Sequence, residues 1–177
     1  ITFEPFYDAY AAVIGLTGAH HVTVELTAPF FQPDLATLEN AFTSKTRMIL
    51  VNNPNNPTGA VFSRAILQRI VELAQRYNVL IVTDEVYEHL TFDDAQHIPL
   101  ATLPGAWERT ITISSAGKTF STTGWKIGWA TAPAELISAI LTVKQYLTFV
   151  NGAPFQPAIA RGLRLPDTFY RDIASTL

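Results

Sequence analysis

Apolar residues recur along the chain in short runs that predict the strands of a sheet. Residues 21–26 alternate apolar and polar side chains, a pattern typical of a strand with one buried face. Residues 48–51 and 79–83 are apolar runs, which predict strands that are buried on both faces. Residues 110–114 are expected to form another strand, and residues 125–132 a further one.

Helices are predicted between these strands from capping residues and apolar stripes. Asp34 is a candidate N-cap for a short helix over residues 35–42, and Ser63 is a candidate N-cap for a longer helix. In the helix after Ser63, four apolar residues share the helical spacing that places them on one face. The residues of this stripe are Leu67, Ile70, Val71 and Ala74.

Three more helices are expected toward the end of the chain, over residues 134–150, 158–163 and 167–177. Strand-like and helix-like segments therefore alternate, and this order predicts an α/β fold with a mostly parallel sheet and flanking helices. In the first of the three helices, one side is expected to be apolar. The residues on that side are Leu136, Ile140, Val143 and Leu147.

Composition narrows the class of protein. The chain has 177 residues, of which 48% are hydrophobic, and this suffices for one sizeable core and one domain. The net charge of −3 gives no sign of a nucleic-acid partner. Cysteine is absent, which excludes disulfides and thiolate metal sites. No signal peptide or long apolar span is recognisable, so we expect no membrane association and a cytoplasmic location.

The chain is expected to be an internal piece of a longer protein. It begins at Ile1, its only methionine is Met48, and its last residues lie within a helical pattern. Residues 1–3 are expected to be the end of a strand.

Polar residues follow three of the predicted strands, at the edge of an open α/β sheet where ligands bind. Asp84 stands at the end of an apolar strand, where a carboxylate is costly to desolvate unless it is paired. A protonated ring nitrogen of a ligand would be such a partner. The structural alternative is that Asp84 caps the following turn.

Lys118 is the second candidate, because it follows the strand predicted at residues 110–114. An amine acts as a nucleophile once burial and neighbouring cations favour its neutral form, and Lys126 is such a neighbour in the sequence. The alternative is a solvated loop lysine. Residues 117–119 also match half of a phosphate-binding P-loop, but Thr112 stands where that motif requires glycine.

Three further side chains could bind a flat ligand that carries oxygen atoms. Asn56 lies in a proline-rich turn, where it could donate to a ligand oxygen or bond its own backbone. Tyr87 follows Asp84 by three residues, so both could face one ligand, or Tyr87 could pack on the sheet. Tyr7 could stack on a flat ring or pack in the core.

Ser115 and Lys126 offer a hydroxyl and a cation that suit a phosphate group. For Lys126 the alternative is an exposed strand residue. The histidines show no metal-ligand spacing, so we expect them, like the Asp93–Asp94 pair, to be structural or solvated, and we expect no metal site. The histidines are His20, His21, His89 and His97.

In this order the motifs resemble those of the class I/II aminotransferases of fold type I, the pyridoxal-phosphate enzymes that include aspartate aminotransferase. The segments that carry the resemblance are residues 56–59 (Asn-Pro-Thr-Gly), 84–87 (Asp-Glu-Val-Tyr) and 115–118 (Ser-Ala-Gly-Lys). The resemblance covers essentially the whole chain and implies an incomplete large domain, of which residues 1–163 are the central part. Residues 164–177 would form a helix that leads toward a missing small domain.

By position, the resemblance implies that Lys118 forms the Schiff base with pyridoxal phosphate and moves the proton during transamination. It implies that Asp84 pairs with the pyridinium nitrogen of the cofactor. The other implied cofactor contacts are Asn56 and Tyr87 at the 3′ oxygen, Ser115 and Lys126 at the phosphate, and Tyr7 on the face of the ring.

In having lysine at position 126, the chain resembles the kynurenine, glutamine and methionine aminotransferase branch. That branch includes bacterial N-succinyldiaminopimelate aminotransferases. Residues 4–7 and 151–156 also resemble that bacterial group. Lysine binds phosphate less directionally than the arginine that many family members carry. The family implies a homodimer that acts on an amino acid and a 2-oxo acid. Because the family's phosphate-binding turn and carboxylate-binding domain are absent, this piece alone is expected to be inactive.

Three alternatives stay open from the sequence. A carbon–sulfur β-lyase on the same scaffold shares removal of the α-proton and diverges afterwards, so its products would identify it. A pyridoxal-phosphate-sensing domain of a transcription regulator would bind the cofactor without turnover. The third alternative is an inert fragment.

Overall fold

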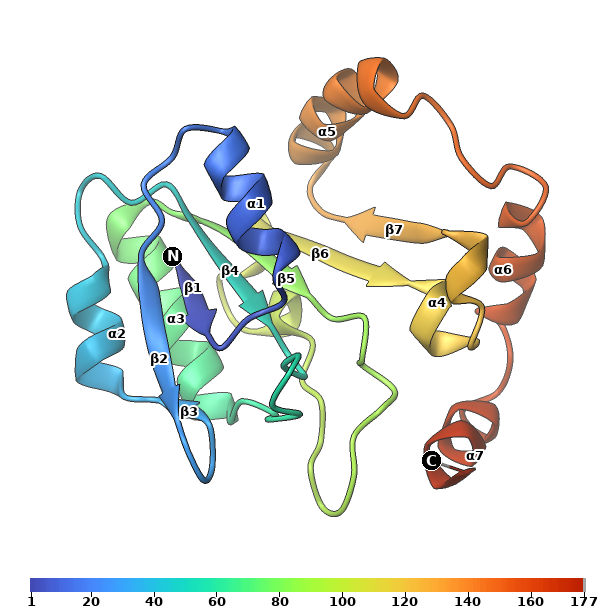
Figure 1. Ribbon diagram of the computed structural model, residues 1–177, viewed down its shortest axis with the longest axis horizontal. Helices are drawn as coiled ribbons and strands as arrows, with labels where there is room; N and C mark the ends of the chain where they lie inside the picture. The colour runs from blue at the N-terminus through green and yellow to red at the C-terminus, as the bar shows by residue number, and fades with distance from the viewer. Residues whose placement is uncertain (177) are drawn as a thin grey trace.

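The computed structural model describes residues 1–176, which form two β-sheets with helices packed around them (Figure 1). One sheet has the strand order β1-β2-β3, and the other has the order β4-β5-β6-β7. The strands are β1 (Thr2–Glu4), β2 (Thr23–Thr27), β3 (Gln32–Pro33), β4 (Met48–Asn52), β5 (Leu80–Asp84), β6 (Thr110–Ser115) and β7 (Gly128–Thr131).

Helices connect the strands, and α1 crosses in front of the sheets while α3 lies behind them (Figure 1). None of the helices within residues 1–176 is both long and apolar enough to cross a membrane. The α-helices are α1 (Ala9–Leu16), α2 (Leu35–Ala41), α3 (Arg64–Tyr77), α4 (Ala116–Thr119), α5 (Ala134–Leu147), α6 (Gln156–Gly162) and α7 (Asp167–Thr176), and the 3₁₀ helices are η1 (Leu100–Thr102), η2 (Trp107–Arg109) and η3 (Thr123–Trp125).

The larger sheet is mostly parallel, as the sequence predicts. Strands β4, β5 and β6 run parallel, and β7 joins β6 as an antiparallel edge strand. The two sheets adjoin, because the Leu50 N–H group donates a hydrogen bond of 2.9 Å to the Ile1 carbonyl oxygen. The α/β fold class is therefore confirmed.

The predicted helix caps and the apolar stripe of α3 are confirmed. The Ser63 hydroxyl accepts a hydrogen bond of 3.4 Å from the Ile66 N–H group, and the Asp34 carboxylate accepts one of 2.8 Å from the Thr37 N–H group. All four stripe residues are fully buried in the main core. Burial of each large aliphatic side chain contributes about 1.5–3 kcal/mol, so this stripe holds α3 against the sheet.

The strand predicted at residues 125–132 begins later than expected, at Gly128. The preceding residues form the 3₁₀ helix η3, and Lys126 has a left-handed backbone with a φ of 55°. A residue with that conformation cannot extend a strand. Lys126 is therefore exposed on a turn, which corrects the alternative that placed it on a strand.

The helix predicted at residues 134–150 ends at Leu147, and its apolar side is not buried within residues 1–176. Val143 and Leu147 on that side are 59% and 76% exposed. The hydrophobic pattern thus identified a real helix, although the residues described here do not cover its apolar face.

Helix α1 was missed because its residues are apolar almost all round and show no polar face. Helix α6 starts two residues before the predicted range 158–163, at Gln156. The last helix begins at Asp167 as predicted, and Leu177, the end of the predicted range, lies outside the described residues.

Candidate active site

The polar segments that follow β4, β5 and β6 leave the sheet at the same edge. In the strand register, Asn52 at the end of β4 pairs with Asp84 at the end of β5, and Asp84 pairs with Ile113 near the end of β6. Because these three strands are parallel, their carboxyl ends meet at one edge (Figure 1). The geometry brings Asn56, Asp84 and Lys118 to one region of the surface.

The Asp84 carboxylate is held by two donors. The Tyr10 hydroxyl donates to Asp84 Oδ2 at 2.6 Å, and the Val86 N–H group donates to Asp84 Oδ1 at 3.3 Å. The second bond is the turn-capping interaction that the sequence offered as an alternative. The first bond comes from α1 and fixes the orientation of a half-buried carboxylate that retains acceptor capacity for a ligand.

Tyr10 was not identified from the sequence. Burial, the nearby Asp84 carboxylate and the hydrogen bond to it together raise the pKa of the Tyr10 hydroxyl well above its ordinary value. The neighbouring Tyr7 and Tyr87 hydroxyls raise it further, so these four side chains lie close together. The available signal was the three-residue spacing from Tyr7, which lies just before α1 and accepts a backbone hydrogen bond of 3.0 Å from the Tyr10 N–H group.

Lys118 lies on the short helix α4, directly after β6. Its ammonium nitrogen is 5.4 Å from the centroid of the Tyr87 ring, within range of a cation–π contact. Neither Lys118 nor Lys126 takes part in a salt bridge within residues 1–176. Lys118 is half-buried rather than a fully solvated loop residue, and its amine stands beside Tyr87.

The proline-rich turn is attached to the end of β5 through Asn52, which the sequence analysis did not single out. Asn52 Oδ1 accepts from the Asn56 N–H group at 2.6 Å, and Asn52 Nδ2 donates to the Asp84 carbonyl at 3.0 Å. The Asx-turn expected as an alternative for Asn56 is formed by Asn55, whose Oδ1 accepts from the Thr58 N–H group and hydroxyl. The turn thus places Asn56 beside the β5 end without using its side chain.

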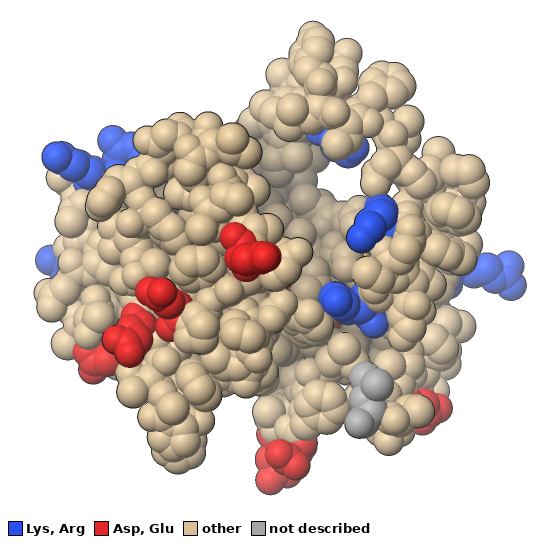
Figure 2. Space-filling view, viewed as in Figure 1, with Lys and Arg blue, Asp and Glu red and all other residues tan. Residues whose placement is uncertain are grey.

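Ser115 and Lys126 lie near one another at the junction of β6 and β7. Ser115 pairs with Gly128 in the antiparallel register, and Lys126 precedes this pair by two residues. The Lys126 carbonyl accepts a hydrogen bond of 2.7 Å from the Asn151 side chain, which holds this turn. In the space-filling view, basic side chains lie along the α4 side of a depression whose other side carries α1 (Figure 2).

Tyr7 is 48% exposed and therefore does not pack in the core, which was its structural alternative. Its ring contacts the Tyr10 ring edge to face, with centroids 5.7 Å apart and an interplanar angle of 82°. Tyr7 thus presents an accessible aromatic surface next to the residue that holds Asp84. The predicted residues offer a flat, anionic ligand an amine, a carboxylate, an amide, hydroxyl groups and a free ring face.

A buried hydrogen-bonded pair, Glu85 and His97, was also missed. Glu85 is 1% exposed, and its Oε2 lies 2.8 Å from Nε2 of His97, whose side chain is 7% exposed. Glu85 Oε1 also accepts from the Thr83 hydroxyl and the Leu100 N–H group. Donor atoms of Glu85, Glu88 and His97 lie within 4.8 Å of one another, although the sequence spacing gave no sign of this cluster. Hydrogen bonds within the protein engage all three of these side chains.

Comparisons with known proteins identify the family of this chain. The profile of the family described as "Aminotransferase class I and II" matches residues 1–174. A curated protein of Mycobacterium tuberculosis named "Probable N-succinyldiaminopimelate aminotransferase DapC" is 51% identical over 100% of this chain and 45% of its own length. The kynurenine–oxoglutarate transaminase of Dictyostelium discoideum is 40% identical over 99% of this chain and 45% of its own length.

Solved structures give the same result. The N-succinyldiaminopimelate aminotransferase of Mycobacterium tuberculosis superposes with a TM-score of 0.96 at 51% identity, over 99% of this chain and 46% of that chain. YbdL of Escherichia coli, reported to have a methionine aminotransferase function, superposes with a TM-score of 0.90 at 35% identity, over 96% and 45% of the respective chains. This chain spans about half the length of the relatives that it matches. It belongs to the class I and II aminotransferase family.

Proposed function

We propose that the whole protein carrying this chain is an aminotransferase that uses pyridoxal phosphate to move an amino group between an amino acid and a 2-oxo acid. The observation that carries this proposal is the placement of Lys118 beside Tyr87 and of a hydrogen-bonded Asp84 at the same sheet edge. Both segments lie within the part of the chain that matches the aminotransferase profile.

The residues at this edge fit that cofactor. Asp84 keeps acceptor capacity after bonding Tyr10 and Val86, so it can accept a bond from a protonated pyridine nitrogen. Asn56 and Tyr87 offer donors to the 3′ oxygen, and Tyr7 offers an exposed ring face. Ser115 and Lys126 supply a hydroxyl and a cation for the phosphate. When bound, pyridoxal phosphate supplies an electron sink for the pair of electrons left at the substrate α-carbon.

Lys118 has two roles in this proposal. Its amine would hold pyridoxal phosphate covalently. When free, the same amine would take up the proton of the substrate α-carbon and deliver it again. Asp84 stabilises the protonated ring nitrogen while this proton moves, because an opposite charge at hydrogen-bond distance favours the charged form.

We propose N-succinyldiaminopimelate as the amino donor, because the relatives of that name share 51% identity with this chain against 40% for a kynurenine transaminase. We further propose that residues 1–163 are the central part of a cofactor-binding large domain and that residues 164–177 lead into a second domain. A cytoplasmic homodimer is the proposed state of the whole protein. The apolar side of α5 supports burial against further protein, since Val143 and Leu147 are 59% and 76% exposed.

Reduction with borohydride tests the central claim. The whole protein is incubated with pyridoxal phosphate, reduced and digested, and peptide mass spectrometry locates the phosphopyridoxyl group. We expect the group on Lys118, its loss in Lys118→Ala, and its retention in Lys45→Ala, a variant of an exposed loop lysine. A group on another lysine, or none, would overturn the assignment.

Product analysis separates the transferase from the other functions. With N-succinyldiaminopimelate and a 2-oxo acid, we expect an amino acid to form from the oxo acid and no reaction without it. Release of pyruvate and ammonia from cystathionine without an oxo acid would identify a carbon–sulfur lyase. Covalent cofactor without any turnover would identify a sensing domain.

A further inference from the structure

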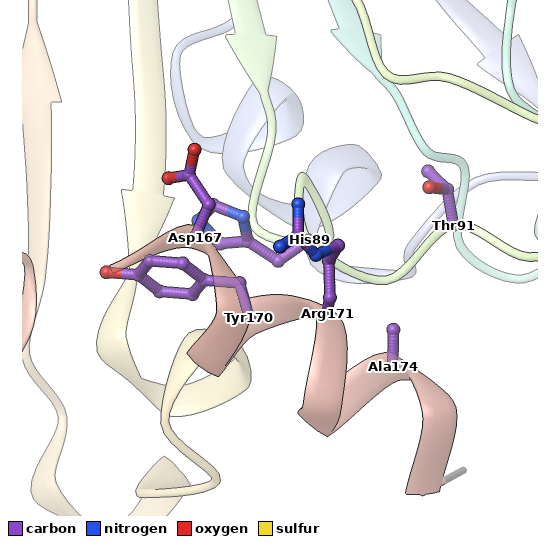
Figure 3. A pocket seen from close by; sticks show the side chains of 6 residues that line it. All are labelled: His89, Thr91, Asp167, Tyr170, Arg171 and Ala174. Atoms are coloured by element: carbon purple, nitrogen blue, oxygen red, sulfur yellow. The ribbon is translucent and has the colours of Figure 1, made fainter. Parts of the chain in front are cut away.

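One aromatic ring on α7 contacts both loops that carry candidate active-site residues. The Tyr170 ring stacks on His89, with centroids 4.2 Å apart and an interplanar angle of 17° (Figure 3). The same ring lies 6.2 Å from the Phe120 ring, centroid to centroid. His89 follows Tyr87 by two residues, and Phe120 follows Lys118 by two residues.

The Phe120 contact fixes the loop of Lys118. Phe120 ends α4, and its ring lies so close to Gly162 of α6 that a Cβ atom at that glycine would stand 3.0 Å from Phe120 Cζ. The Phe169 ring of α7 also lies 5.9 Å from the Phe120 ring, centroid to centroid. The Phe120 ring, two residues after Lys118, is therefore held between α6 and α7.

The His89 contact fixes the loop of Tyr87. This loop is a tight turn in which the Leu90 N–H group donates to the Tyr87 carbonyl at 2.8 Å. The Ser114 hydroxyl donates to Glu88 at 2.6 Å and so ties the same turn to β6. Stacking of His89 on Tyr170 adds an attachment of this turn to α7 (Figure 3).

The hydroxyl of Tyr170 anchors the ring itself. It donates a hydrogen bond of 3.3 Å to the Gly162 carbonyl oxygen, which joins α7 to the end of α6. A hollow of about 320 Å³ lies beside the ring and is lined also by Thr91, Asp167 and Arg171. His89 and Tyr170 both line this hollow (Figure 3).

We propose that Tyr170 is a positioning residue that holds the Lys118 loop and the Tyr87 loop at a fixed separation. The ring works as a bridge, because it contacts His89 on one loop and Phe120 on the other while its hydroxyl is fixed to α6. The distance of 5.4 Å between the Lys118 amine and the Tyr87 ring depends on that bridge. The consequence for catalysis rests on the proposed function, whereas the mechanical bridge does not.

Hydrogen exchange of the cofactor-free whole protein tests the bridge. In Tyr170→Ala we expect the amides of residues 86–90 and 116–121 to exchange together roughly two- to tenfold faster, the range that loss of aromatic contacts produces. Tyr170→Phe keeps both ring contacts and loses only the bond to Gly162, so its rates should lie between those of wild type and Tyr170→Ala. Tyr77→Ala is the matched control, since it removes a tyrosine that packs on Phe42 of the main core and precedes β5, whereas the loop of Tyr87 follows the other end of that strand.

A second variant tests the proposal even if Tyr170→Ala does not fold. His89→Ala removes one side of the stack only, so residues 86–90 should exchange faster while residues 116–121 remain protected. Unchanged exchange of both loops in the Tyr170 variant, or equal acceleration in Tyr77→Ala, would overturn the proposal.

The loaded enzyme supplies the catalytic readout. The visible absorbance of bound pyridoxal phosphate is titrated against pH, and its midpoint should move by about half a pH unit in Tyr170→Ala, because the donor from Tyr87 is displaced. Tyr170→Phe, which keeps both ring contacts, should give a midpoint between those of wild type and Tyr170→Ala. If exchange changes as expected while the protein binds no cofactor at all, the proposed function fails and the bridge stands; if the cofactor binds and neither readout moves, the bridge fails alone.

Discussion

The Tyr10 hydroxyl donates a hydrogen bond of 2.6 Å to the Asp84 carboxylate across 74 positions of sequence. It ties α1 to the end of β5 and orients the carboxylate. A hydrogen bond to a charged acceptor contributes about 1.5–3 kcal/mol when its partner remains buried. Because both groups are only half-buried, we expect Tyr10→Phe to lower the unfolding free energy by about 1–2 kcal/mol, measured by urea denaturation at neutral pH. Tyr146→Phe, at an exposed position, should have no effect.

The same pair predicts a dependence of stability on alkaline pH. Burial and Asp84 raise the pKa of Tyr10 in the folded protein above its ordinary value near 10. A group whose pKa is raised on folding stabilises the folded state fully at pH values below its pKa in the unfolded chain. This stabilisation is lost as pH rises from the unfolded-state pKa toward the folded-state pKa. The stability difference between wild type and Tyr10→Phe should therefore narrow by about 1.4 kcal/mol between about pH 9 and 11. A difference that stays constant over that interval would show that Tyr10 ionises normally.

Asp84→Asn tests the carboxylate charge separately from its position. The amide has the same shape, and the Asp84 carbonyl still accepts from Asn52 and Asn53, so the fold should persist. Loss of the charge opposite a protonated ring nitrogen should lower kcat/KM for transamination about 10²- to 10³-fold, the scale of a preorganised electrostatic contact. Asp94→Asn, in an exposed turn, is the matched control and should keep full activity. Equal activity of both variants would remove Asp84 from the mechanism.

The buried pair of Glu85 and His97 predicts a large effect on stability. His97→Ala leaves a carboxylate that is 1% exposed without one of its hydrogen-bond partners, and loss of such a partner costs about 1–3 kcal/mol, or more for a charged group. Adding Glu85→Gln to that variant should return part of the loss, because an uncharged amide is less costly to bury than a carboxylate. Thermal and urea unfolding provide the measurement, with His20→Ala, at an exposed position, as control. If the double variant is less stable than His97→Ala, the charge is not the cause.

Most of the helices and strands could be predicted from the sequence, because capping residues and hydrophobic periodicity are local signals that suffice to locate them. Ser63 and the α3 stripe follow from capping chemistry and helical periodicity, and the structure has both. The strand prediction at residues 125–132 was wrong at its start, because the left-handed backbone of Lys126 interrupts the extended conformation. The neighbouring residues in the sequence do not reveal that φ angle. The exposed side of α5 is a different case, since periodicity indicates an apolar face but not its partner.

Long-range contacts explain what the sequence could not provide at the candidate site. The order of motifs indicated Asp84 and Lys118, yet their supports come from elsewhere in the chain. Tyr10 belongs to a helix without a polar face, and His97 follows Glu85 at a spacing with no known signature. Such partners become visible only when the strand register places their segments side by side.

Asn52 provides the final test, because it joins the two segments that carry Asn56 and Asp84. Its side chain is almost fully buried, with Oδ1 bonded to the Asn56 N–H group and Nδ2 bonded to the Asp84 carbonyl. Asn52→Ala leaves both groups without that partner, which should cost about 2–4 kcal/mol in unfolding free energy. Asn40→Ala, on the exposed side of α2, should cost far less.

Asn52→Asp separates the two bonds of this side chain. The aspartate keeps an acceptor for the Asn56 N–H group but places an oxygen against the Asp84 carbonyl, so the connection to β5 breaks while the connection to the turn remains. We expect a loss of pyridoxal-phosphate affinity in both Asn52 variants, measured by equilibrium dialysis, because Asn56 and Asp84 no longer keep their separation. Normal affinity in Asn52→Asp together with reduced affinity in Asn52→Ala would assign the effect to the turn alone.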